Sequence, residues 1–230
     1  MVNAGLPGEW VDARAAIVTN DDYTRAVPIA HKTNAALKAT VLKAIQAGKG
    51  LLLLTPHLGA FEFAARGYAE RFGQRQPITV LYRPARQAML AQWQTYSRTA
   101  PGMQAAPANL SGVRQMLRAL RKGETVGLLP DQVPPEGMGQ WTPFFGKPAY
   151  TMTLAARLAL QTGAQVVLIW GERLPWGRGY RLHTRTLGHE LSDNLDVAVV
   201  QINQAMERLI SRQPGQYLWG YARYKQPRSE

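Results

Sequence analysis

Residues 51–62 read Leu-Leu-Leu-Leu-Thr-Pro-His-Leu-Gly-Ala-Phe-Glu, and the rest of the chain is organised around this stretch. Four consecutive leucines between Gly50 and Pro56 are typical of a central strand that is buried on both faces. Pro56 is expected to end that strand, because its nitrogen has no hydrogen to donate to a neighbouring strand. His57 then falls on the loop at the carboxyl end of the strand, where open α/β sheets hold their ligands.

His57 is a candidate general base. A solitary histidine is more often structural or simply exposed than catalytic. Its place after a buried strand, with Gly59 allowing close approach of the backbone, favours a function. The chain has no cysteine and no Gly-x-Ser-x-Gly motif, so we interpret His57 as a base rather than the partner of a serine or cysteine nucleophile.

Strand-like and helix-like segments alternate along the chain. The predicted strands cover residues 51–54, 78–82, 125–129 and 165–170, with an edge strand at 180–187; the predicted helices cover 61–72, 110–122, 151–162 and a long segment from about 193. This alternation predicts an α/β layered domain with a mostly parallel central sheet flanked by helices. Since no repeat or linker divides the chain, residues 1–230 are expected to form one domain.

Two more polar residues follow predicted strands. Asp131 comes after the strand at 125–129, in the same relation to its strand as His57. Arg83 comes after the strand at 78–82, where an arginine can bond a phosphate or a carboxylate. An ordinary surface arginine fits that position equally well. We expect His57, Arg83 and Asp131 to lie along one rim of the sheet.

Three large aromatic residues, Trp141, Phe144 and Phe145, lie within five positions after a loop rich in proline and glycine. Beside a site they would wall an apolar ligand pocket. The alternative is a plug that fills the space between the loop and the sheet.

Lysine and arginine number 27 against 15 aspartate and glutamate residues, which gives a net charge of +12 and attraction to polyanions. The chain has no nucleic-acid-binding motif, so an anionic membrane surface or a phosphorylated lipid is the favoured partner. The basic residues of the segment 110–122 either form a solvated face or contact headgroups or an acidic carrier protein. No metal-ligand spacing such as His-Glu-x-x-His occurs, so we expect no metal.

Several blocks of sequence resemble a known family. The stretch from His57 to Glu62 is similar to the His-x4-Asp/Glu motif of glycerolipid acyltransferases. Further blocks follow in order: Leu81-Tyr82-Arg83-Pro84, Leu129-Pro130-Asp131-Gln132, Trp141-Thr142-Pro143-Phe144-Phe145-Gly146, and Tyr217-Leu218-Trp219 with Arg223 and Lys225. Together they resemble the lipid A biosynthesis (lauroyl/myristoyl) acyltransferases. Many relatives carry a histidine near the position of Tyr221, so any role of that histidine does not transfer.

The resemblance implies transfer of a fatty acyl group from a thioester donor, acyl carrier protein or acyl-CoA, to a hydroxyl of a lipid A precursor. His57 would take the proton without an acyl-enzyme, and no cofactor is needed. Arg83 would hold a phosphate of the donor or of the phosphorylated glycolipid acceptor. Gly59 would let backbone N–H groups approach the developing oxyanion, and the aromatics at 141–145 would hold the acyl chain.

A base needs an acid on its other ring nitrogen, and two carboxylates compete for this place. Glu62 is the choice of the family motif. Five residues correspond to about 140° around a helix axis, so Glu62 reaches His57 only if His57 precedes the helix. Asp131 comes from another strand end. We expect at least one of them to bond His57.

The family usually has an N-terminal membrane-anchor helix, and this chain has no apolar run near the roughly 18–20 residues that span a bilayer. We expect a peripheral protein at the cytoplasmic face of the bacterial inner membrane, either by nature or because the anchor piece is missing. The alternatives are an acyltransferase for another glycolipid or lysophospholipid, a non-catalytic membrane lipid-binding protein and, least favoured, a nucleic-acid binder.

Overall fold

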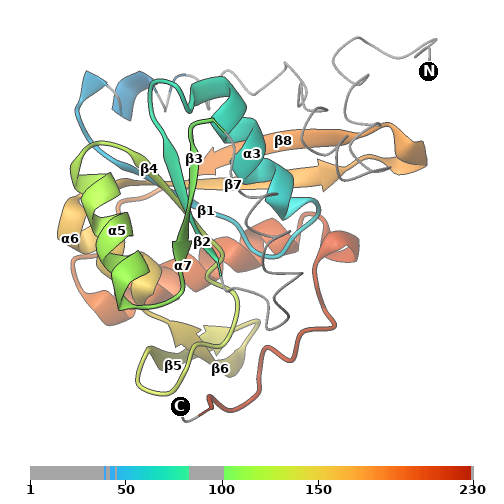
Figure 1. Cartoon of the computed structure of the whole chain (residues 1–230). Coiled ribbons are helices and arrows are strands. Elements are labelled where there is room, and N and C mark those ends of the chain that lie inside the picture. The colour runs from blue at the N-terminus through green and yellow to red at the C-terminus, as the bar shows by residue number, and fades with distance from the viewer. Residues whose placement is uncertain (1–38, 40–41, 45, 83–100, 229–230) are drawn as a thin grey trace, which may run out of the picture.

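A six-stranded sheet lies at the centre of the computed structural model, which describes residues 39, 42–44, 46–82 and 101–228 (Figure 1). The strand order is β3-β2-β4-β1-β7-β8. The bounds are β1 Leu51–Leu54, β2 Ile78–Tyr82, β3 Met103–Pro107, β4 Thr125–Leu128, β7 Gln165–Arg173 and β8 Tyr180–Thr186. Neighbouring strands are parallel except for β8, which pairs antiparallel with β7 at one edge. The predicted α/β class and mostly parallel sheet are confirmed.

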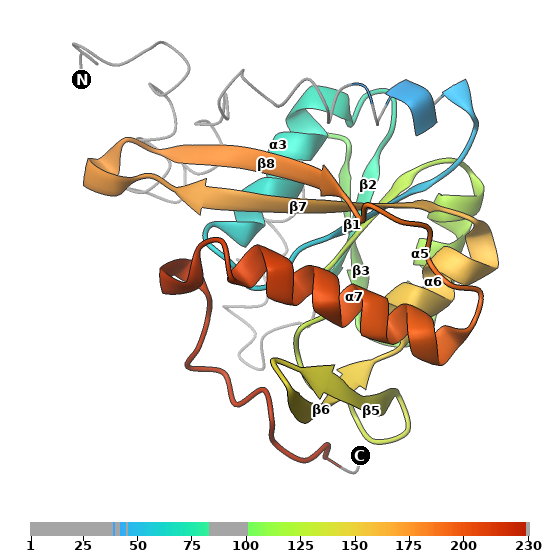
Figure 2. The ribbon, with the colours of Figure 1, turned by 180° about the vertical axis from the view of Figure 1, so that it is seen from behind.

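The four leucines of β1 alternate between two apolar cores and are at most 2% exposed. Leu52 and Leu54 pack into the core that contains residues of α5 (Leu110–Arg121), α6 (Leu154–Thr162) and α7 (Leu195–Ile210). Leu51 and Leu53 pack on the other face, against α3 (Phe61–Phe72). Figure 1 shows α3 in front of the sheet, and Figure 2, from behind, shows α7 in front. Burial of both faces explains why β1 is apolar throughout.

Strands β7 and β8 form a long hairpin that projects beyond the other strands (Figure 2). Leu54, the end of β1, pairs with Leu168, whereas β7 continues to Arg173. The extra length of β7 runs beside the loop that follows β1, and a bridge joins Gly59 to Gly171. The hairpin therefore forms a wall next to the loop that carries His57.

The structure differs from the sequence prediction between residues 101 and 153. Strand β3 was not predicted, because Met-Gln-Ala-Ala-Pro has few residues that favour strands. The segment predicted as a loop with a helix from residue 151 contains a hairpin, β5 (Gly139–Phe144) and β6 (Lys147–Met152). Pro143 and Pro148 oppose each other in it and mask the strand pattern. Consequently α6 begins only at Leu154.

Candidate active site

His57 and Asp131 meet because their strands are neighbours in register. Leu54 of β1 pairs with Leu128 of β4, and each chain continues for three residues to His57 or Asp131. The Nδ1 atom of His57 lies 2.7 Å from Oδ1 of Asp131. The backbone N–H of His57 donates to Oδ2 at 2.8 Å. One carboxylate thus holds both the backbone and the ring of His57.

The carboxylate of Asp131 is 2% exposed, whereas the side chain of His57 is 16% exposed. Tyr217 and Arg223 add polar groups around the buried acid. Burial raises the pKa of the Tyr217 hydroxyl, and the charge of Asp131 and a hydrogen bond to it raise it further. Burial lowers the pKa of Arg223, and the negative charge of Asp131 opposes that shift. The Tyr217 hydroxyl and the Arg223 guanidinium are therefore the polar groups that interact with the buried carboxylate from the C-terminal segment.

The second ring nitrogen of His57 faces the loop after β4. The amide nitrogen of Gln132 lies 3.1 Å from Nε2 of His57. Because the carboxylate on Nδ1 fixes a proton there, Nε2 has a lone pair and accepts this bond. The ring of Phe61 packs edge-on against the imidazole, with the centroids 4.9 Å apart. A substrate hydroxyl that donates to Nε2 has to replace the amide of Gln132.

Of the two candidate acids, the carboxylate at 2.7 Å from the ring is that of Asp131. Glu62 lies half-buried in the first turn of α3, where the positive end of the helix dipole favours an acid. His57 precedes the first residue of α3 by four positions, so the condition for an approach of Glu62 is met. Arg83 lies outside the described residues.

Gly59 brings the loop against β7. Its φ is +60°, and a Cβ atom there would lie 2.0 Å from the carbonyl oxygen of Gly171. The N–H of Gly59 donates to the oxygen of Gln216 at 2.9 Å, and the N–H of Ala60 donates to Gly171 at 2.7 Å. Since both N–H groups are bonded to carbonyls, the predicted contact with an oxyanion requires donors other than these two.

We predict that Gly59→Ala destabilises the protein by about 3 kcal/mol or more, because the new methyl group meets a backbone carbonyl. Gly163→Ala is the matched control, since Gly163 has φ +63° but nothing within 4 Å of its Cβ position. It should cost about 1 kcal/mol, a shift in Tm of about 2–4 °C. Thermal unfolding followed by circular dichroism measures both, and equal shifts would show that the contact with Gly171 is not limiting.

The three aromatics of β5 and its turn do not face one cavity. Phe144 is 1% exposed and belongs to the core, whereas Trp141 is 48% and Phe145 37% exposed. The alternation of β5 explains this, because Thr142 and Phe144 point inward and Trp141 points outward. Phe144 therefore fills the core, as in the alternative in which the aromatics form a plug. It also lines a surface cavity.

The segment that follows α7, residues 217–225, also packs against the site, and this placement was not predicted from the sequence. The N–H of Leu218 donates to the carbonyl of His57 at 3.1 Å. The N–H of Val133 donates to the Tyr221 hydroxyl at 2.9 Å, which ties the segment to the loop after β4. Both Gln132 and Tyr217 belong to sequence blocks that the sequence analysis had singled out, and these blocks were the signal that could have identified them as site residues. The sequence did not show where in the fold these blocks lie.

No three histidine, cysteine, aspartate or glutamate side chains of the described ranges are grouped so that they could hold a metal ion. Over the same ranges, no helix combines the length and the apolar character that crossing a membrane requires.

Comparisons with known proteins agree with these features. Residues 18–226 match the family described as bacterial lipid A biosynthesis acyltransferase. The chain is 29% identical to a lipid A biosynthesis lauroyltransferase of Escherichia coli, over 98% of this chain and 68% of that relative. It is 27% identical to a lipid A biosynthesis palmitoleoyltransferase of the same organism, over 77% of this chain and 56% of that relative. The chain is 26% identical to a lipid A biosynthesis acyltransferase of Haemophilus influenzae, over 75% of this chain and 52% of that relative. The matched regions thus span between about half and two thirds of the length of these relatives.

Proposed function

The chain belongs to the bacterial lipid A biosynthesis acyltransferase family, and we propose that it transfers a fatty acyl group from a thioester to a hydroxyl of a lipid A precursor. The observation that supports this most directly is the contact of 2.7 Å between His57 and the buried Asp131 at the carboxyl end of the sheet. A partly exposed imidazole with a buried acid on one nitrogen is arranged as a general base. The relatives named above are acyltransferases, which agrees with that chemistry.

In the proposed reaction, Nε2 of His57 takes the proton of the acceptor hydroxyl while the oxygen attacks the thioester carbonyl. A C–O bond forms, the C–S bond breaks, and the sulfur leaves as a thiolate that takes the proton from the imidazolium. Asp131 stabilises the imidazolium in between. Because the acceptor attacks directly, no acyl-enzyme forms, which agrees with a chain that has no cysteine.

The other site residues keep their proposed roles in substrate binding. Arg83 would pair with a phosphate of the acceptor or donor. The exposed rings of Trp141 and Phe145 offer an apolar surface to the acyl chain, and Phe144 supports them from the core. Gly59 shapes the loop that carries the base. No cofactor takes part.

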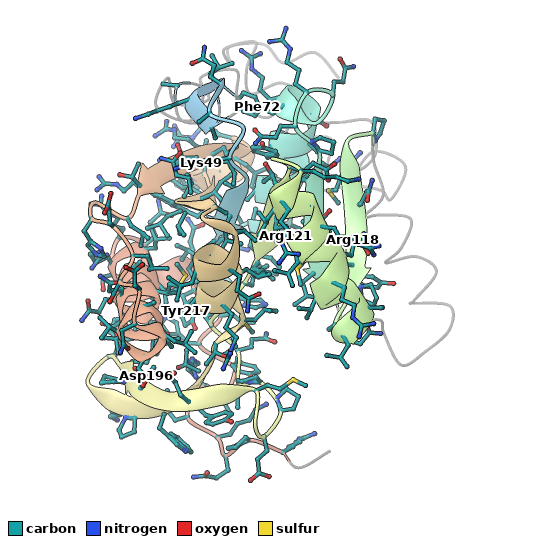
Figure 3. The ribbon with its side chains drawn as sticks, turned by 90° about the vertical axis from the view of Figure 1, so that its left-hand side faces the viewer. Lys49, Phe72, Arg118, Arg121, Asp196 and Tyr217 are labelled. Carbon is teal, nitrogen blue, oxygen red and sulfur yellow. The ribbon has the colours of Figure 1, made fainter. Side chains whose placement is uncertain are left out.

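An acyl carrier protein is the donor that the basic face of α5 would favour, with acyl-CoA as the other candidate. Four cations of this helix and its end are exposed: Arg114, Arg118, Arg121 and Lys122. Figure 3 shows Arg118 and Arg121 on α5, on a different element from Tyr217. A hollow of about 440 Å³ lies among these arginines and Leu117. An acidic carrier would meet complementary charge there.

We predict that the double variant Arg118→Glu, Arg121→Glu raises the KM for an acyl carrier thioester by roughly tenfold, because the charge of the docking face is reversed. The KM for a small neutral acyl thioester should not change. Arg185→Glu on β8 is the matched control, since Arg185 is equally an exposed arginine on a distant element. Steady-state rates at low and moderate salt test this, and equal effects on both donors would exclude α5 as the carrier surface.

We also propose that the protein works peripherally at the cytoplasmic face of the bacterial inner membrane. The net charge of +12 supports attraction to anionic lipid. Acceptors with several acyl chains reside in a membrane, so the enzyme has to reach that surface.

The decisive experiment measures, by mass spectrometry, the mass of the product that the purified protein forms from a defined acyl thioester. A tetra-acylated phosphorylated disaccharide and a lysophospholipid are offered as separate acceptors. An added acyl group on the disaccharide supports the proposal. Acylation of the lysophospholipid alone would favour the broader acyltransferase alternative, and no product with either would favour a lipid-binding protein.

A further inference from the structure

A cavity of about 420 Å³ lies next to the candidate active site. It is lined by Phe144 and by seven residues of the C-terminal segment: Tyr217, Trp219, Tyr221, Ala222, Arg223, Tyr224 and Lys225. This volume falls within the range of ordinary small-molecule sites, which is about 300–1,000 Å³. The cavity shares Tyr217 with the surroundings of Asp131, but it contains neither His57 nor Asp131.

Two cations line this cavity. Arg223 is 4% exposed and donates through Nη1 to the oxygen of Tyr150 at 2.7 Å and through Nη2 to Oγ1 of Thr151 at 2.6 Å. Its Nε atom is buried and has no hydrogen-bond partner. Because this atom is inaccessible, Arg223 contributes its positive charge to the cavity rather than a direct contact. The ammonium of Lys225 lies 4.5 Å from the ring centroid of Tyr221 and forms no ion pair with a described residue.

Aromatic rings supply the remaining walls. The ring of Trp219 lies edge-on to that of Tyr217, with the centroids 4.8 Å apart, and its Nε1 donates to the oxygen of Pro214. Trp219 is 58% exposed, so it stands at the mouth of the cavity rather than in the core. Tyr221 is fixed by its bond from Val133. These rings are held in place before any ligand arrives.

We propose that this cavity binds a phosphorylated sugar of the acceptor, a role that rests on the proposed acyl transfer. Lys225 binds the phosphate, the buried charge of Arg223 adds to the positive potential of the cavity, and the aromatic rings pack on the sugar. An acyl chain fits this cavity less well, because it would cover two cations without pairing them. Tyr217 and the bond from Leu218 to His57 connect the cavity to the base, so a bound sugar lies beside the reacting group.

The test compares Lys225→Gln with wild type on a phosphorylated acceptor and on the same acceptor without phosphate. The variant should raise the KM for the phosphorylated acceptor about tenfold, as expected for loss of one charged contact. The KM for the dephosphorylated acceptor, the KM for the donor and kcat should stay unchanged. Lys49→Gln removes an equal charge at the far end of β1 from His57 and should change nothing; Figure 3 shows Lys49 well apart from Tyr217.

Arg223 is left intact in this test, because its bonds to Tyr150 and Thr151 hold the fold together. Trp219→Ala is the second variant, since an exposed ring is replaced without harm to the core. It should raise the KM for both acceptors, because the sugar loses its aromatic contact whether or not phosphate is present. An unchanged preference for phosphate in Lys225→Gln, or an equal rise in KM for both acceptors, would overturn the proposal.

A binding measurement separates this inference from the acyl transfer itself. Glucosamine 1-phosphate should raise the Tm of wild-type protein, glucosamine should not, and the rise should be lost in Lys225→Gln. Inorganic phosphate is tested in the same way. If phosphate alone raises the Tm as much as glucosamine 1-phosphate does, the cavity binds only an adventitious ion, and the sugar assignment is overturned. If binding behaves as expected while no acyl transfer is detected, the proposed function fails, and the cavity remains a sugar-phosphate site without the role of holding an acceptor. If transfer occurs and Lys225→Gln binds like wild type, the cavity assignment fails alone.

Discussion

Replacement of His57 with alanine is expected to lower kcat/KM for acyl transfer by about 10²–10⁴-fold, the usual contribution of a positioned general base. The Nε2 atom is the group that takes the hydroxyl proton in the proposed reaction, and Gln132, its partner at 3.1 Å, cannot replace it because an amide is not a base. Initial rates with a labelled acyl thioester measure the loss. A variant that keeps more than a tenth of wild-type activity would exclude His57 as the base.

The control for His57→Ala has to address folding, because alanine leaves Oδ1 of the buried Asp131 without its partner. His57→Gln is the suitable companion, since its amide can still donate to the carboxylate while lacking a basic nitrogen. We expect both variants to be equally inactive. His57→Gln should unfold closer to the wild-type temperature than His57→Ala, as measured by circular dichroism. Activity in His57→Gln would mean that the ring acts only as a structural link.

Replacement of Asp131 with asparagine is expected to reduce kcat by about 10²–10⁴-fold, because a neutral amide neither stabilises the imidazolium nor fixes the proton on Nδ1. The same change weakens the bonds from the His57 N–H and ring, and it removes the charge that faces Tyr217 and Arg223. We therefore expect a loss of stability of about 2 kcal/mol. The corresponding fall in Tm is about 4–8 °C for a chain of this size.

Glu62→Gln, measured in parallel, separates the two acids. If Asp131 orients the base, Asp131→Asn loses more activity than Glu62→Gln, and its loss persists at a temperature where both variants are folded. The reverse order would assign the orienting role to Glu62, whose place in the first turn of α3 permits a substrate-dependent approach. Rates at several temperatures below both unfolding transitions decide between them.

The sequence predicted β1, α3 and β4 almost to the residue, because burial and helix period are local properties of the chain. It did not decide between Glu62 and Asp131, since that choice depends on which strand lies next to β1. Strands β2 and β3 lie between β1 and β4 in chain order, and only the parallel pairing of β1 with β4 brings Asp131 to the ring. Strand order arises from the packing of the whole sheet, which no single segment encodes.

The aromatic block and the C-terminal segment were recognised in the sequence but not placed. Phe144 turned inward because β5 alternates, and the two opposed prolines concealed that strand. The contacts of Leu218 with His57 and of Tyr221 with Val133 join residues far apart in the chain, so no local pattern reports them. Gly59 is different, because a glycine in a loop beside a candidate base already indicated close backbone contact.

The bond from Leu218 to His57 also affects how the protein matures. A ribosome makes β1 and β4 well before it makes Leu218, so the sheet can form while the loop around the imidazole still lacks its support. A nascent chain would therefore hold a folded scaffold with an unfinished reaction centre. Premature termination or proteolytic clipping before Tyr217 would remove this support together with the buried bonds of Arg223, so we expect such a fragment to be inactive and less stable than the full chain.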